Sequence, residues 1–125
     1  MMTPDKRTPG PDHPITITPC DQRVRVLIGD TVIAETTRAL ALQEAQYPEV
    51  LYIPREDADA KLLQLSDRVT YCPYKGDASY FTIKANGVAL ENAIWSYQTP
   101  YPAMEQIKGH LAFYPDKVTI QLLAR

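Results

Sequence analysis

The chain of 125 residues has little cysteine and little histidine, with two residues of each kind. Cys20 and Cys72 can form one bridge at most, and nothing else in the sequence indicates an oxidising compartment, so we expect free thiols. His13 and His110 stand singly, and no cysteine or histidine spacing typical of a zinc site occurs. We therefore expect no bound metal and no cofactor.

The sequence also lacks a strong charge of either sign and any long apolar run. Its net charge is −2, whereas proteins that bind duplex nucleic acid usually carry a basic face, so we expect no nucleic-acid partner. No apolar segment approaches the length that crosses a bilayer, and the N-terminus has neither a basic nor an apolar signal region. We expect no membrane association and a cytoplasmic location.

Proline and tyrosine are abundant instead, with eleven and eight residues. Proline is costly inside helices and central strands, so its positions mark corners of the chain. Tyrosine suits half-buried sheet faces. Residues 1–13, with Pro4, Pro9 and Pro11, predict a mobile N-terminal tail. Residues 14–125 predict one domain.

Alternation at period two predicts short strands along most of this domain. Gly29-Asp30 and Asn86-Gly87 predict two-residue hairpin turns. Residues 39–42 are ambiguous because alanine and leucine favour helix, but the flanking strands favour a strand. Two short helices are predicted, at residues 54–65, with a stripe of Ala58, Leu62 and Leu65, and at residues 102–108. The fold class is mainly β, a single antiparallel β-rich domain with two short helices.

We expect the chain to be organised around residues 71–77, a loop that holds a thiol, an amine, a carboxylate and two phenols. Lys75 lies three residues from Cys72, so an ammonium could lower the pKa of the thiol and make Cys72 a nucleophile. The alternative is a cysteine packed at a strand end, because cysteine is often buried and no histidine lies nearby in the sequence. The packed cysteine is the more common case.

Several segments together resemble one known family, the small domain of unknown function 427. They are Arg38-Ala39-Leu40, residues 52–57, Cys72-Pro73-Tyr74-Lys75-Gly76 with Tyr80, residues 91–97, residues 107–109 and residues 112–115. The resemblance covers roughly residues 14–119 and implies a compact fold of the β-tent kind. It implies no established activity. His110 stands where the family pattern leads us to expect tyrosine, so it inherits no role.

A nucleotidyltransferase label has sometimes been attached to that family, and Asp57 and Asp59 have the spacing of a carboxylate pair that holds Mg²⁺ against phosphates. Such enzymes carry the pair after a Gly-Ser loop, and no Gly-Ser occurs in this chain. The two carboxylates are equally explained by the positive end of a helix dipole. We therefore expect no metal site there.

The remaining candidate site residues are polar or aromatic side chains that could share a pocket. Glu91 is the best acid or base candidate, although it could equally pair with a base across the sheet. The candidates for catalysis are Cys72, Lys75 and Glu91, and those for ligand binding are Arg38, Lys75, Tyr80, Glu91, Trp95 and Tyr97. We expect Lys75 and Glu91 to meet at one pocket.

Three functions remain open at this point. The first is binding of a small polar or anionic ligand in a pocket lined by tyrosine and tryptophan near the loop at 71–77. The second is a protein-interaction module that uses edge strands or a tyrosine-rich face. The third is a thiol-dependent enzyme that uses Cys72. A small-molecule ligand is the expected partner, and the oligomeric state is left open.

Overall fold

The computed structural model describes residues 6–124. Within them it has ten strands in three antiparallel sheets, with the strand orders β1-β4-β5, β10-β2-β3 and β6-β7-β8-β9. The strands are β1 (Ile15–Pro19), β2 (Arg23–Ile28), β3 (Thr31–Thr36), β4 (Leu40–Glu44), β5 (Val50–Tyr52), β6 (Leu63–Cys72), β7 (Gly76–Ala85), β8 (Val88–Ser96), β9 (Ala112–Phe113) and β10 (Thr119–Leu123).

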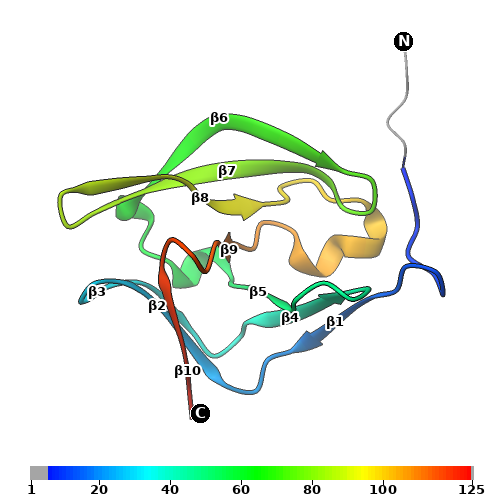
Figure 1. The fold of residues 1–125 in the computed structure, drawn as a ribbon, viewed down its shortest axis with the longest axis horizontal. Helices are drawn as coiled ribbons and strands as arrows, with labels where there is room; N and C mark the ends of the chain where they lie inside the picture. The colour runs from blue at the N-terminus through cyan, green and yellow to red at the C-terminus, as the bar shows by residue number, and fades with distance from the viewer. Residues whose placement is uncertain (1–5, 125) are drawn as a thin grey trace.

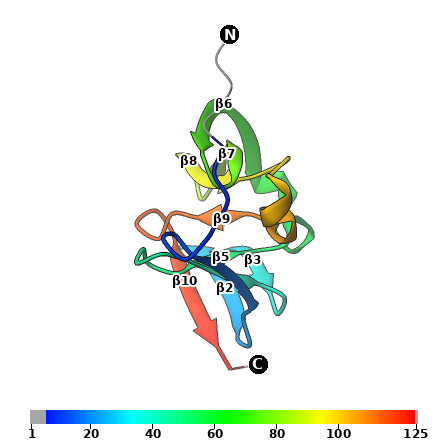
Figure 2. The ribbon, with the colours of Figure 1, turned by 90° about the vertical axis from the view of Figure 1, so that its right-hand side faces the viewer.

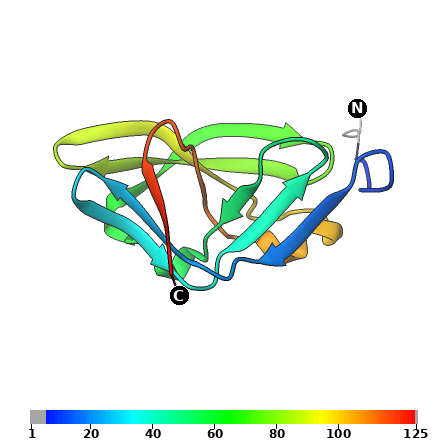
Figure 3. The same ribbon diagram turned by 60° about the horizontal axis from the view of Figure 1, so that its bottom comes forward.

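The sheets form two layers (Figure 1). The long strands β6, β7 and β8 make one layer, and the two three-stranded sheets make the other (Figure 2). Viewed from below, β1 and β4 lie side by side, as do β2 and β10 (Figure 3). Between the layers, β9 pairs with β8, and backbone hydrogen bonds of 2.7 and 2.8 Å join Leu111 to Ile53 just after β5.

The hydrophobic core lies between these layers and has two clusters. In the first, Val24 and Ile33 of the lower layer pack with Phe81 and Ile94 of the upper one. The second cluster surrounds Tyr52. It contains two more buried tyrosines, Tyr80 and Tyr97, and two buried side chains of a 3₁₀ segment, Met104 and Ile107. Burial of each large apolar side chain contributes roughly 1.5–3 kcal/mol, so the contact between layers is the main source of stability.

The predicted mainly-β, antiparallel fold class is confirmed. Both predicted hairpin turns form, and Asn86 and Gly87 have φ of 55° and 75°, as a type I′ turn requires. The ambiguous segment at 39–42 lies largely in β4. Both cysteines are free, as expected.

The predicted helix at residues 54–65 is wrong. Two 3₁₀ turns, η1 (Arg55–Asp57) and η2 (Ala60–Leu62), occupy its first part, and β6 begins at Leu63. The apolar stripe was misleading because Leu65 is 64% exposed on β6. Asp59 caps η2 by accepting a hydrogen bond of 3.1 Å from the Lys61 N–H, which stops the chain from continuing as one helix.

The second predicted helix is a 3₁₀ segment, η3 (Pro102–Ile107), with a kink at Met104. Its predicted inward residues, Met104 and Ile107, are buried. No helix among the described residues is long and apolar enough to cross a bilayer.

The mobile tail at residues 1–13 stays a prediction, and residues 1–5 lie outside the described part. Its later residues contact the domain: the Arg7 N–H donates to the Pro73 carbonyl at 2.8 Å, and the His13 ring stacks on Tyr74 with centroids 4.0 Å apart. The segment therefore lies against the loop that the sequence marked as central.

Candidate functional site

The loop between β6 and β7 turns tightly and packs against the segment after β8. The Lys75 N–H donates to the Cys72 carbonyl at 3.2 Å, and the Tyr101 N–H donates to the Lys75 carbonyl at 3.0 Å. Gly76 has φ of 105°, and a Cβ there would meet the Thr99 carbonyl oxygen at 3.6 Å. Glycine is required by the backbone angle more than by space.

Lys75 is the buried charge of this loop, with only 5% of its surface exposed. Its ammonium forms an ion pair with Glu44 at the end of β4, and the second carboxylate oxygen of Glu44 accepts a hydrogen bond from His13 Nε2 at 2.7 Å. The expectation that Lys75 meets Glu91 is wrong: Glu91 is exposed on β8 and has no ion pair with Lys75. The partner is Glu44, the last residue of β4.

The electrostatics of this cluster favour the ionised carboxylate. Burial acts to raise the pKa of Glu44, but hydrogen bonds from Lys75 and His13 outweigh it and hold that pKa below its ordinary value. Lys75 Nζ also lies 3.9 Å from Cys72 Sγ. The Lys75 ammonium is also paired with Glu44, and the His13 imidazole is bonded to Glu44. No described histidine hydrogen-bonds to the thiol of Cys72.

The predicted aromatic residues Tyr80, Trp95 and Tyr97 belong to one cluster but differ in burial. The Trp95 indole N–H donates to the Tyr52 hydroxyl at 3.2 Å. Tyr97 is 7% exposed, and burial raises the pKa values of Tyr97 and Tyr52 above the ordinary tyrosine value. Tyr97 and Tyr52 are therefore core side chains, whereas Trp95 is half-buried and reaches a cavity.

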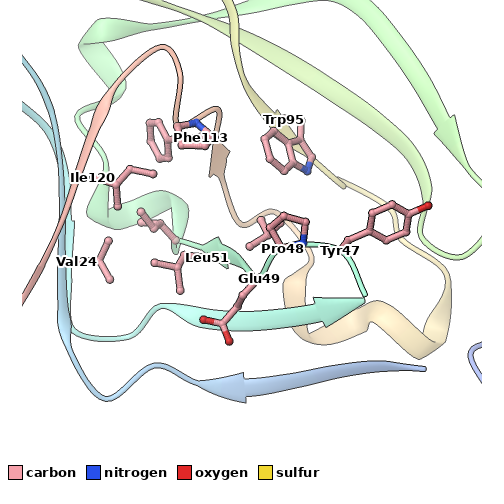
Figure 4. Close-up of a pocket in the computed structure, with 11 residues that line it drawn as sticks. Val24, Tyr47, Pro48, Glu49, Leu51, Trp95, Phe113 and Ile120 are labelled. Carbon is pink, nitrogen blue, oxygen red and sulfur yellow. The ribbon is translucent and has the colours of Figure 1, made fainter. Parts of the chain in front are cut away.

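That cavity has a volume of about 360 Å³ and lies between the layers. Figure 4 shows the rings of Trp95 and Phe113 on one side and aliphatic side chains on the other. Its lining is mainly apolar and includes Val24, Leu51, Ile53, Trp95, Phe113 and Ile120, with Glu49 as the charged member and Tyr47 at one end.

Tyr80 and Glu91 do line one pocket, but it is a different one of about 320 Å³. It also contains Arg68, Asn92, Tyr114 and Lys117. Arg38 belongs to neither pocket: its guanidinium pairs with Glu56 and Asp57, each at 3.1 Å, and the hydrogen bonds to these two carboxylates raise the pKa of Arg38. The six predicted ligand-binding residues are thus spread over separate places.

Asp57 and Asp59 have local structural partners. Besides Arg38, Asp57 Oδ2 accepts a hydrogen bond from the Thr36 hydroxyl at 2.6 Å, and Asp59 caps η2. The described residues contain no group of three or more histidine, cysteine or acidic side chains placed to hold a metal ion.

A family model described as a domain of unknown function, DUF427, matches residues 16–123. The chain belongs to the DUF427 family. The match covers nearly the whole domain and confirms the resemblance seen in the sequence motifs. No curated protein matches the chain. The family description gives no activity, so the pockets are the features of the molecule that bear on its function.

Sequence reasoning missed Glu44 and His13 in the cluster around Lys75, and it missed the cavity wall formed by the segment between β4 and β5. One signal was present for this wall: Tyr47-Pro48 followed by Val50-Leu51 places aromatic and aliphatic groups beside a proline corner. Nothing in the sequence connects Glu44 to Lys75, which follows 31 residues later.

Proposed function

We propose that this DUF427 domain binds a small, ring-bearing molecule in the apolar cavity beside Trp95. The observation that carries the proposal is the half-buried indole of Trp95 in the wall of a cavity of about 360 Å³. Ligand sites are typically concave, mainly apolar and preformed, and fall in a range of about 300–1,000 Å³. This volume suits one ring or a fused pair of rings.

The indole is fixed in a way that suits ring recognition. Its N–H is already bonded to the Tyr52 hydroxyl at 3.2 Å, so no unsatisfied donor faces the cavity. The Tyr114 ring supports Trp95 from the side, with centroids 4.5 Å apart. An aromatic ring that stacks on the indole gains about 0.5–1.5 kcal/mol beyond the area that it buries.

Charge narrows the ligand class further. Glu49 is the charged residue of the lining, and Lys75, which the sequence offered as an anion anchor, is neutralised by Glu44. A carboxylate beside an apolar cavity disfavours anionic ligands and favours neutral or cationic ones. The ligand expected for this cavity is therefore less anionic than the sequence alone suggested.

Three fragments with the same ring and different charge provide the test: benzamide, benzamidine and benzoate. Trp95 is the chain's one tryptophan, so its fluorescence reports on the cavity directly. We expect saturable changes in emission with benzamide and benzamidine, with Kd values in about the millimolar range that suits fragments. Benzoate should bind at least about tenfold more weakly, because its carboxylate would lose hydration against an apolar lining whose one charged member, Glu49, is also negative.

A cavity-filling variant supplies the control. Ile120→Phe adds a ring to the cavity lining and should abolish the fluorescence response. Val32→Phe makes the same kind of change at a residue that is 42% exposed and outside the cavity, so it should leave the response intact. Equal binding of benzamide by both variants would place the ligand elsewhere and contradict the proposal.

A protein-interaction module is the second candidate because of β6. It is an edge strand of the four-stranded sheet, and Leu65 and Val69 on it are 64% and 62% exposed. Exposed apolar side chains on a sheet edge are a known means of pairing with another chain. The cavity is favoured because it is concave and mainly apolar, whereas β6 is interrupted by a bulge between Leu65 and Val69.

A further inference from the structure

The second pocket, of about 320 Å³, owes its shape to an irregularity in β8. Phe81 of β7 pairs with Ile94 and Ile83 pairs with Leu90, so the three residues 91–93 lie opposite Thr82 alone. Asn92 adopts φ of 53° within this bulge. Bulges redirect side chains and are frequent beside functional sites. Here Glu91 and Asn92 both line the pocket.

Three charged side chains enter this pocket without a salt bridge. Arg68 comes from β6, Lys117 from the turn before β10 and Glu91 from β8. Within residues 6–124, none of the three forms an ion pair with a charged side chain. Arg68 instead lies over the Tyr80 ring, 4.9 Å from its centroid. Two cations and one anion are thus available to a ligand.

Two phenols add hydrogen-bonding groups between the charges. The Tyr80 hydroxyl and Thr70 Oγ1 form a hydrogen bond of 2.9 Å, and Tyr114 lines the same pocket. Burial acts to raise the pKa of Tyr80, but the polar neighbours Thr70, Tyr114 and Arg68 outweigh it and lower that pKa, whereas burial and the nearby Tyr80 raise the pKa of Tyr114 to about 12. Tyr114 therefore stays protonated and can donate a hydrogen bond.

Asn92 supplies an acceptor that lacks a donor. Its backbone N–H donates to Thr82 Oγ1 at 3.3 Å, but its side-chain Oδ1 is buried and has no hydrogen-bond partner in the described part of the chain. A buried acceptor without a donor costs about 1–3 kcal/mol. A ligand N–H that reaches between Asn92 and Glu91 would satisfy both, given a small rotation of the amide.

We propose that this pocket binds a small zwitterion, with its carboxylate toward Arg68 and Lys117 and its ammonium toward Glu91 and Asn92. The proposal does not depend on the apolar cavity, which shares no lining residue with this pocket. Cations for the carboxylate and acceptors for the ammonium match both halves of such a molecule. A simple anion would leave the acceptors unused.

The test uses glycine, β-alanine and γ-aminobutyrate as zwitterionic probes of increasing length, with acetate and methylamine as probes of one charge each. NMR resonances of Tyr80 and Tyr114 report on the pocket. We expect at least one zwitterion to shift them saturably, with an affinity at least about tenfold above that of acetate or methylamine. Equal affinity for acetate and the zwitterions would overturn the proposal, as would shifts that do not saturate.

Variants locate the site. Asn92→Gly keeps the positive φ available and removes the acceptor, so the preference for a zwitterion over acetate should fall about tenfold. Lys117→Gln should weaken zwitterion binding about tenfold, whereas the matched change Lys61→Gln, on η2 outside the pocket, should leave it unchanged. The proposal is wrong if Lys61→Gln and Lys117→Gln have the same effect. Benzamide binding at Trp95 stays a separate readout for the apolar cavity.

Discussion

Lys75 is the residue whose role changes most between sequence and structure. A lysine beside a glycine in a turn suggests an exposed anchor for anions, yet this one is 5% exposed and bonded to Glu44. A buried ammonium without a partner would lose its hydration at a cost of several kcal/mol. The pair with Glu44 offsets that cost and fixes the loop at 71–77 onto β4.

A double-mutant cycle on Lys75 and Glu44 tests this structural role. Glu44→Gln should lower the free energy of unfolding by on the order of 3 kcal/mol because it leaves the buried Lys75 uncompensated, and Lys75→Met should cost less because Glu44 keeps its bond to His13. The double variant should lose clearly less than the sum of the two. Chemical denaturation measures all four proteins.

The same cycle with Glu91 in place of Glu44 is the control. Glu91 is exposed and does not pair with Lys75, so Lys75→Met and Glu91→Gln should be additive within about 0.5 kcal/mol. Additivity in both cycles would mean that the buried ion pair contributes nothing to the stability of the fold.

This pair also shows what the sequence could not supply at the residue scale. The residue types of the loop at 71–77 marked it correctly as a place where polar groups gather. Its partners depend on which strands lie below it, and β4 reaches the loop only through the packing of two sheets. Period-two patterns predict strands but give no order of strands within a sheet.

At the scale of elements, the hairpins and the position of the helix at 102–108 were predictable, whereas the helix at 54–65 was not. Asn86-Gly87 and Gly29-Asp30 carry their turn geometry in two residues, so local sequence determines them. The helix prediction at 54–65 failed because an apolar stripe at helical spacing also fits two 3₁₀ turns that lead into a strand. The cap at Asp59, the hydrogen bond from Thr36 to Asp57 and the pairing of β6 with β7 decide between these outcomes, and the last two are tertiary contacts.

The tips of two hairpins are joined across the layers by one side chain. Asn86 Nδ2 donates to the Ile28 carbonyl at 2.8 Å, and its Oδ1 accepts from the Thr31 hydroxyl at 2.6 Å. Asn86 thus serves twice, by adopting a positive φ in the β7–β8 turn and by holding the β2–β3 turn. The sequence predicted the first role and not the second.

Two substitutions at Asn86 separate these roles. Asn86→Gly tolerates the positive φ and removes the hydrogen bonds, which are exposed, so we expect a loss of about 1 kcal/mol in the free energy of unfolding. Asn86→Ala should lose about 1 kcal/mol more because alanine is strained at φ of 55°. A Cβ at Gly87 would lie in open space, so Gly87→Ala measures the cost of backbone strain without a steric clash. Equal losses for Asn86→Gly and Asn86→Ala in urea denaturation would contradict the strain argument.

For the whole molecule, the two layers meet in three places of different character. One is an apolar core with the cavity beside Trp95, one is the polar pocket between Tyr80 and Lys117, and one is the cluster that joins Lys75 to Glu44 and His13. Only the last depends on a carboxylate that is partly buried and hydrogen-bonded in the folded state. Its ionisation therefore links the association of the layers to pH.

Glu44 should make the stability of the domain fall in acid. Its pKa in the folded chain lies below the ordinary value of 4.5, so the unfolded chain binds more protons in acid. The stabilisation by Glu44 is complete above pH 4.5 and is lost as pH falls through the folded pKa.

The measurement compares the unfolding free energies of three proteins: the native chain, Glu44→Gln and Glu105→Gln, whose substituted residue lies on the surface. The difference in unfolding free energy between the native chain and Glu44→Gln should be large near pH 7. Near pH 3 it should shrink toward the difference between the native chain and Glu105→Gln. A difference that stays constant over this range would show that Glu44 acts through its shape and not through its charge.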